Sequence, residues 1–343
     1  MPVSPLEIEN TFQRDVDQVA EKAIAAYDLT FTQTSQADLN EPLLRWIDFA
    51  SRYIPQARRQ ILASNKFPLK LPPDAETGLH RVEQLLIWGG DVNPYQSKTL
   101  TRFNDTSGSK RQKRTDGLWA DWGIHHLHLP LNPVAPGQPY SDRSGWLLFL
   151  MVYGNAALFI DVREHNEKNL FSLRDLTEIY LRNWPEDAER YRLHGVLGLN
   201  QPMTASDAEH KQLRDSGVNQ ILEVDGKVYC GPGMGITTAV TSTRVSIQRN
   251  SIRSNTRAIA GEVARADGQF QQKMQSLGVA SPEFDLMLLE NGNLAIYERK
   301  TTMCWPVPRQ NPERIDDLFC TWHNQLLPEW AGLKVARFWA ANP

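Results

Sequence analysis

The pair Asn291-Gly292 is the feature that most narrows the possible folds of this chain, because it marks a β-hairpin turn. It lies within FDLMLLENGNLAIYE, residues 284–298, between two runs rich in apolar residues. A two-residue type I′ turn needs positive φ at both positions, which Asn and Gly tolerate best. Counting outward from such a turn places Asp285 directly opposite Glu298. The sequence therefore predicts a hairpin with one apolar face and one charged face.

The charged face of this hairpin has the composition of a metal site. Two adjacent carboxylates repel each other unless a cation lies between them, and Mg²⁺ prefers a few oxygen ligands together with water. Lys300 follows Glu298 by two residues and could orient or deprotonate an attacking water. These parts suit hydrolysis of a phosphodiester. The alternative is an exposed hairpin whose charges form ordinary surface pairs of small value.

The stretch PEFDLMLLENGNLAIYERKT, residues 282–301, resembles the D…ExK motif of the PD-(D/E)xK nuclease superfamily. It is similar to the Holliday-junction-resolvase-like and restriction-endonuclease-like branches, and the resemblance is limited to the C-terminal region. The resemblance implies that Asp285 and Glu298 hold Mg²⁺ or Mn²⁺, that Lys300 completes the motif, and that Glu262 corresponds to the family's helical Glu. It also implies that helix, hairpin, helix and strand follow part of an αβββαβ core.

The stretch GIHHLHL, residues 123–129, is a second candidate site. On a strand, His126 and His128 point to one face and His125 points to the other. Two neighbouring histidines can bind a metal, or act as general base and acid in RNA cleavage without one. Arg143 and His165 could join them. The alternative is that these histidines are hydrogen-bonded groups of the core.

Two sets of basic residues are candidates for contacts with the phosphates of a nucleic acid. Clustered cations bind such a backbone by displacing its counterions. One set lies in a polar loop and the other recurs every four residues, on one face of a predicted helix. Either set could equally be a solvated surface. The two sets are Lys110, Arg111, Lys113 and Arg114, and Arg249, Arg253 and Arg257.

The composition excludes several other classes of protein. The chain has 343 residues, 41% of them hydrophobic, and a formal net charge of -3, so attraction to polyanions must come from local patches. Its three cysteines lack CxxC spacing, which argues against a disulfide framework and a thiolate zinc site. The longest apolar stretch, residues 145–160, is interrupted by Gly154-Asn155. We therefore expect a cytoplasmic protein without a membrane span.

The pattern of apolar residues predicts an α+β fold in three regions. Residues 1–115 read as mainly helical and end in the basic loop, with helices over 7–28, 41–64 and 77–90, the second of them kinked or divided at Pro55. Residues 116–245 read as mixed and contain the histidine strand. Residues 246–343 read as the nuclease-like region: a long helix, the hairpin, a helix and a final strand over 333–341.

These observations favour a nuclease acting on DNA or RNA. The preferred mechanism uses a divalent metal at the charged hairpin. One alternative is a metal-independent ribonuclease of toxin type that uses the histidine strand. Another is a non-catalytic interaction protein of a defence or toxin–antitoxin system. A nucleic acid is the expected partner, and a second copy of the chain or another protein is left open as a further partner.

Overall fold

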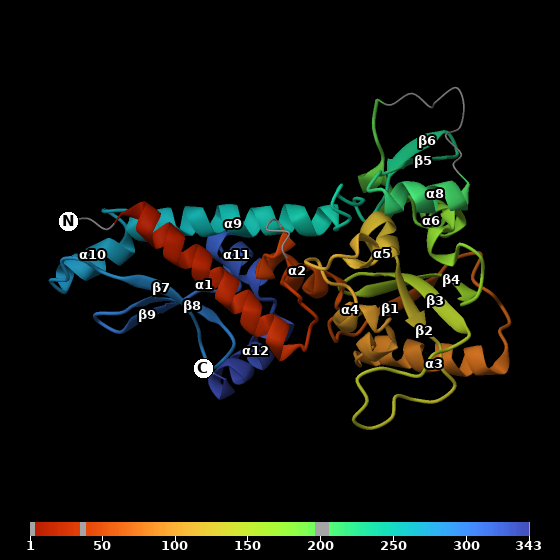
Figure 1. Ribbon diagram of the computed structural model, residues 1–343, viewed down its shortest axis with the longest axis horizontal. Coiled ribbons are helices and arrows are strands. Elements are labelled where there is room, and N and C mark those ends of the chain that lie inside the picture. The colour runs from red at the N-terminus through yellow and green to blue at the C-terminus, as the bar shows by residue number, and fades with distance from the viewer. Residues whose placement is uncertain (1–3, 35–38, 196–205, 343) are drawn as a thin grey trace. The chain divides into compact units, whose positions relative to one another are not determined.

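The protein has an α+β fold, described here from a computed structural model for residues 4–34, 39–195 and 206–342 (Figure 1). Its contacts divide the chain into two compact units, one formed by residues 1–50 and 245–343 and the other by residues 51–244. The C-terminal region expected from residue 246 lies within the first unit, which also contains the first fifty residues. The second unit begins at residue 51 and includes residues from both of the other expected regions.

The first unit combines helices with a small antiparallel sheet of strand order β7-β8-β9. Helix α1 packs against β7 and α12. Its helices are α1 (Pro5–Ala26), α2 (Pro42–Arg52), which extends two residues past the division, α9 (Thr243–Ala264), which begins two residues before it, α10 (Gln269–Ser276), α11 (Leu318–Leu326) and α12 (Glu329–Ala341). Its strands are β7 (Phe284–Leu288), β8 (Leu294–Glu298) and β9 (Met303–Pro306).

Two predictions for this unit are wrong. The single long helix expected after residue 246 is divided into α9 and α10, with Gly268 as the N-cap of the second helix. The final strand expected over residues 333–341 is part of α12. Its buried residues Ala331, Val335 and Ala336 follow a helical spacing, whereas Leu333, which a strand would bury beside Val335, is half exposed.

The second unit is built on a four-stranded sheet of order β1-β4-β3-β2, in which β1 is parallel to β4 and the other pairs are antiparallel. The strands of this sheet are β1 (Gln60–Ala63), β2 (His125–His128), β3 (Trp146–Val152) and β4 (Ala156–Glu164), and a separate hairpin is formed by β5 (Ile221–Val224) and β6 (Lys227–Cys230). The α-helices are α3 (Pro73–Trp88), α4 (Thr99–Arg102), α5 (Gly117–Trp122), α6 (Arg174–Asn183), α7 (Pro185–Ala188) and α8 (Asp207–Asp215). Short 3₁₀ turns η2 (Asn93–Tyr95), η3 (Arg111–Lys113), η4 (Leu170–Ser172) and η5 (Glu189–Tyr191) connect them.

The helix predicted over residues 41–64 is only half helical. Helix α2 ends at Arg52, before Pro55, and residues 60–63 form β1 along the edge of β4. Proline disfavours helix continuation, and the free edge of β4 supplies hydrogen-bond partners for the chain that follows. Gly154-Asn155 and Asp225-Gly226 form the turns of the β3-β4 and β5-β6 hairpins.

Each face of the four-stranded sheet packs on its own core. Helix α3 covers one face, where Leu79 and Val82 meet Leu127 and Phe159. Helices α5 and α6 cover the other face, where their residues pack against Phe149 and its neighbours. Side chains alternate along β2 at the edge of the sheet, so Leu127 enters the α3 core while His126 and His128 point to the opposite side. No helix in the described ranges is both long and apolar enough to cross a membrane.

Candidate active site

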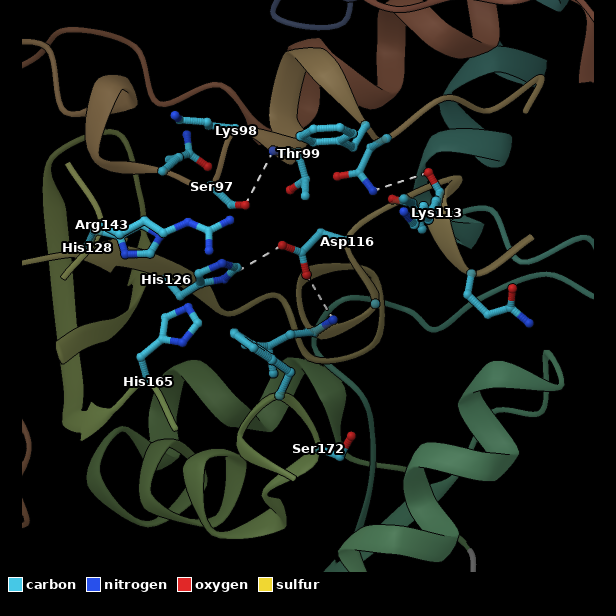
Figure 2. A pocket seen from close by; sticks show the side chains of 18 of the residues that line it. Ser97, Lys98, Thr99, Lys113, Asp116, His126, His128, Arg143, His165 and Ser172 are labelled. Carbon is cyan, nitrogen blue, oxygen red and sulfur yellow. Dashed lines mark hydrogen bonds and ion pairs between the residues drawn. The ribbon is translucent and has the colours of Figure 1, made fainter. Parts of the chain in front are cut away.

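A pocket of about 530 Å³ beside the edge strand β2 brings together the four residues predicted as the second candidate site. They are His126, His128, Arg143 and His165 (Figure 2). The first two come from β2, Arg143 comes from the loop between β2 and β3, and His165 directly follows β4. The remaining lining comes mainly from residues 96–118 and from helix α8. All of these segments belong to the second unit.

Asp116 holds the first histidine of this pocket in place. As the N-cap of α5, it accepts hydrogen bonds through Oδ1 from the amides of Leu118 at 3.0 Å and Trp119 at 3.2 Å. Its Oδ2 lies 3.6 Å from His126 Nδ1 (Figure 2). Burial acts to raise the pKa of Asp116, but His126, Arg52 and the Trp119 amide outweigh it and keep the pKa below its usual range. The site therefore contains a carboxylate anchored by a helix behind an imidazole.

The surroundings of His126 lower the pKa of its imidazole, which favours the neutral ring. Burial lowers its pKa, and the positive charges of His165 and Arg52 lower it further, although Asp116 acts in the opposite direction. A neutral imidazole backed by a carboxylate can accept a proton, because the carboxylate stabilises the imidazolium that results. His126 thus has the environment of a general base.

His128 and His165 stack against each other, with 5.6 Å between ring centroids and 20° between ring planes. Burial, His126, His165, Arg143 and Lys98 together lower the pKa of His128 to about 4. Its Nδ1 is buried and makes no hydrogen bond in the described part of the chain. The basic side chains Arg143 and Lys98 both contribute to this low pKa, so both act on the part of the pocket around His128.

The positive character of the pocket extends along its lining. Basic side chains outnumber aspartates there by five to three. Lys98 and Arg143 are exposed and form no ion pair with any residue that the structure describes. The ammonium of Lys113 lies 5.9 Å from the ring centroid of Phe103. Cations that are not already neutralised by carboxylates are available to a bound anion.

Two neighbouring groups named by the sequence have structural roles instead. His125 points away from His126 as predicted, is nearly buried near Trp119, and has its pKa lowered by burial to about 3. Arg163, two residues before His165, is bound to carboxylates: its guanidinium donates to Asp161 and Asp175, each at 2.6 Å.

The sequence did not point to Asp116 or Lys98. Asp116 precedes LWADW, and an Asp just before an apolar run is a helix-start signal, so its capping role was readable. Its proximity to His126 depends on how α5 packs against β2, which no local pattern specifies. Lys98 carries no sequence signal of its own, since it lies outside the basic run at 110–114.

The predicted register of the charged hairpin is wrong by one residue. The turn contains three residues, 290–292, and is closed by the Leu289 amide donating to the Asn293 carbonyl at 2.8 Å. Asp285 therefore pairs with Tyr297, and Glu298 pairs with Phe284. Because side chains alternate along a strand, Asp285 and Glu298 point to opposite faces. The two expected metal ligands do not meet.

The local reason for this shift is the turn itself. Gly292 has a φ of +82°, whereas Asn291 is not among the residues with positive φ, so the backbone lacks the two positive angles of a type I′ turn. The turn also packs against α12 at Gly332. A Cβ atom added to Gly292 would lie 2.5 Å from the backbone of that glycine. Tertiary packing thus favours a three-residue loop that the same Asn-Gly pair also permits.

Glu298 is a buried structural group. It is 0% exposed and accepts hydrogen bonds from the amides of Glu283 and Thr301, both at 2.8 Å, and from Thr301 Oγ1 at 2.7 Å. Burial acts to raise its pKa, but these hydrogen bonds outweigh burial and lower it. Its oxygens are occupied by the chain segments on either side, so Glu298 is placed to close the end of the hairpin.

The other members of the predicted metal site are also engaged elsewhere. Asp285 accepts two hydrogen bonds from the half-exposed guanidinium of Arg299, one of them at 2.6 Å. Lys300 lies 3.1 Å from Glu283, and Glu262 forms a surface pair with Arg265. Among the described residues, no three His, Cys, Asp or Glu side chains are grouped to hold a metal ion. With Asp285 and Glu298 on opposite faces of the hairpin, they are not placed to hold one Mg²⁺ or Mn²⁺ ion between them.

The arginine stripe on α9 binds carboxylates within its own unit. Arg249 and Arg253 both donate to Glu41, and Arg253 also binds Asp17. Arg257 pairs with Glu9 of α1 at 2.8 Å. These ion pairs connect α9 to α1 and to the segment before α2, which accounts for the four-residue spacing as a packing feature.

The residues of the basic loop have different roles: two arginines hold the loop in place, and one lysine lines the pocket. Arg114 is 2% exposed, and its guanidinium donates to the carbonyls of Gly108 at 2.9 Å and Ala239 at 2.7 Å, so it ties the loop to a distant segment of the same unit. Arg111 donates to the carbonyl of Thr238. Lys110 is exposed, and Lys113 lines the pocket.

Comparisons with known proteins complete the description of the site. No protein-family model, no curated protein and no solved structure matches this chain. The assignment of a function therefore depends on the chemistry of the residues that the fold brings together.

Proposed function

We propose that the second unit cleaves RNA without a metal ion, using the histidine pocket beside β2. The observation that carries this proposal is the convergence of three histidines, a helix-anchored aspartate and two unpaired basic side chains on one cavity. Histidine pairs perform general acid–base catalysis near neutral pH, and cations stabilise the charge that develops on a phosphate. The pocket contains both kinds of group.

In the proposed reaction, His126 removes the proton from a ribose 2′-hydroxyl, whose oxygen attacks the adjacent phosphorus atom. The bond from phosphorus to the 5′-oxygen breaks, and His165 in its protonated form gives its proton to that oxygen. The products are a 2′,3′-cyclic phosphate and a free 5′-hydroxyl. Asp116 stabilises the imidazolium formed on His126, since its carboxylate lies 3.6 Å from the ring nitrogen.

The cations act on the phosphate during this step. Lys98 and Arg143 both influence the pKa of His128, so both lie near the same part of the pocket (Figure 2). A phosphate bound there accepts their hydrogen bonds while negative charge accumulates on its non-bridging oxygens. His128, neutral and stacked on His165, fixes the orientation of that ring.

The proposal requires a ribose, because the attacking oxygen is the 2′-hydroxyl. The decisive experiment incubates end-labelled single-stranded RNA, and DNA of the same sequence, with the purified protein in EDTA. We expect RNA to be cut and DNA to remain intact, with a 2′,3′-cyclic phosphate on the upstream fragment. His126→Ala and His165→Ala should each slow cleavage by about 10²- to 10⁴-fold.

Two variants serve as controls. His80 is an exposed histidine on α3, outside the pocket lining, so His80→Ala should cleave like the wild type. Glu298→Ala tests the hairpin, with thermal unfolding as the check that this variant is folded. Cleavage that requires magnesium and disappears in a folded Glu298→Ala variant would return the chemistry to the hairpin and refute the proposal. Absence of cleavage of any RNA would also refute it and would favour a non-catalytic interaction protein.

A further inference from the structure

An aromatic ring is exposed directly beside the histidines of the pocket. Phe171 lies in η4 and is 37% exposed. Its ring centroid is 5.0 Å from that of His126 and 6.3 Å from that of His165. Exposure of a phenylalanine costs hydrophobic stabilisation that a buried position would provide. A ring in this position next to the reacting groups is available to a ligand.

The backbone that carries this ring is held firmly. The carbonyl of Phe171 accepts a hydrogen bond from Arg214, and Arg214 is buried and bound to Asp121 at 3.0 Å. The Ser172 amide donates to the Asn169 carbonyl at 2.7 Å. A platform fixed in this way loses little conformational freedom when a planar group stacks on it.

A second exposed ring lies in the same lining. Phe103 is 53% exposed and has the ammonium of Lys113 at 5.9 Å from its centroid. Aromatic rings interleaved with cations are the usual combination for single-stranded nucleic acids, since rings stack on bases and cations bind phosphates. Bases in a duplex are already stacked on one another and are not available for this contact.

We infer that Phe171 and Phe103 are base-stacking platforms and that the pocket therefore selects single-stranded over paired RNA. This inference rests on the proposed function for the identity of the substrate, and it adds the structural state of the RNA. In it, the base next to the phosphate held by Lys98 and Arg143 stacks on Phe171. The neighbouring part of the strand meets Phe103 and Lys113.

The test measures binding separately from cleavage. A short fluorescein-labelled oligoribonucleotide with 2′-O-methyl sugars lacks the attacking hydroxyl and stays intact during the measurement. Its affinity is measured by fluorescence anisotropy, single-stranded and annealed to its complement, for the wild type, Phe171→Ala, Phe171→Trp and Phe103→Ala. Trp88→Ala is the control, because Trp88 is a 66% exposed aromatic residue on α3 outside the pocket.

We expect the wild type to bind the single strand more tightly than the duplex. Phe171→Ala should weaken single-strand binding by about 5- to 150-fold, the range for loss of one stacked base. Phe171→Trp should restore it, and Trp88→Ala should not change it. Phe103→Ala should weaken it by a smaller factor. Thermal unfolding checks that each variant is folded, and Phe171→Trp separates stacking from a loss of packing.

Equal affinities for single and paired RNA, or wild-type affinity in Phe171→Ala, would overturn the inference. The two proposals fail in distinguishable ways. Single-strand binding that depends on Phe171 without any cleavage of natural RNA would retain the inference and refute the ribonuclease. Cleavage that needs His126 but is indifferent to Phe171 and to pairing would retain the ribonuclease and refute the inference.

Discussion

Replacement of Glu298 by alanine should destabilise the first unit strongly, because this carboxylate closes the charged hairpin from inside. The substitution removes three charge-assisted hydrogen bonds and leaves the amides of Glu283 and Thr301 without their acceptor. A hydrogen bond to a charged group contributes about 1.5–3 kcal/mol, and such bonds are not additive when they share one acceptor. Each buried donor left without an acceptor costs about 1–3 kcal/mol, so the two amides together account for about 2–6 kcal/mol. We expect a loss within this range.

The assay is equilibrium urea unfolding followed by tryptophan fluorescence, with Glu290→Ala as the matched control. Glu290 is an exposed carboxylate in the turn of the same hairpin, so its replacement should change the free energy of unfolding by less than about 0.5 kcal/mol. Glu298→Gln should lie between the two, since an amide offers only one acceptor oxygen and its NH₂ faces an N–H donor.

The pH dependence provides an independent check of sign. The pKa of Glu298 is lowered in the folded state, so its stabilisation is present above the pKa of an unfolded-state carboxyl. It is lost as the pH falls through the lower, folded-state pKa. The difference between wild type and Glu298→Ala should therefore shrink in acid. A loss below about 1 kcal/mol at neutral pH would refute the structural role that we assign to Glu298.

Three further predictions concern other charged residues. Burial raises the pKa of Asp15 from 3.8 to about 6, so wild-type stability should fall by about 2–3 kcal/mol as the pH rises from about 4 to 6. Asp15→Asn should abolish this pH dependence in urea unfolding, and an unchanged pH dependence would contradict the raised pKa of Asp15. Arg253→Ala should destabilise the first unit by about 2–4 kcal/mol in the same assay, because it leaves Glu41 partly unpaired. The affinity for RNA should stay at the wild-type value. A reduced affinity would indicate that the arginine stripe contacts the nucleic acid. Asp116→Asn retains a good N-cap residue, so thermal unfolding should be unchanged. RNA cleavage should slow by about 10- to 100-fold, because the imidazolium of His126 loses its counter-charge. Full cleavage activity in this variant would show that Asp116 has no part in the mechanism.

Much of the second site was predictable because it depends on period-two alternation. The spacing of His126 and His128 places both on one face of any strand, and the structure confirms that face. Arg143 and His165 join them because β2, β3 and β4 are consecutive antiparallel strands, which commonly lie side by side. The contribution of Asp116 was not predictable, since it depends on how α5 packs against the sheet.

The errors arise where tertiary contacts choose between locally equivalent structures. Asn291-Gly292 fits loops of two or three residues, and the close approach of Gly292 to Gly332 accompanies the longer one. The segment over residues 333–341 contains both alternating and helical apolar positions, and its packing on α1 selects the helix. Strand β1 exists because β4 offers an open edge, which lies almost a hundred residues further along the chain.

The low pKa of His128 would couple the binding of a phosphate to proton uptake under the proposed function. Burial, together with His126, His165, Arg143 and Lys98, lowers the pKa of this ring to about 4. A phosphate placed among them offsets their charge, so the pKa of His128 rises when the anion binds. By linkage, the anion then binds more tightly as the pH falls, because each ligand strengthens the other by the same factor. Under the proposed function, the affinity of the pocket for a phosphate should therefore rise as the pH falls.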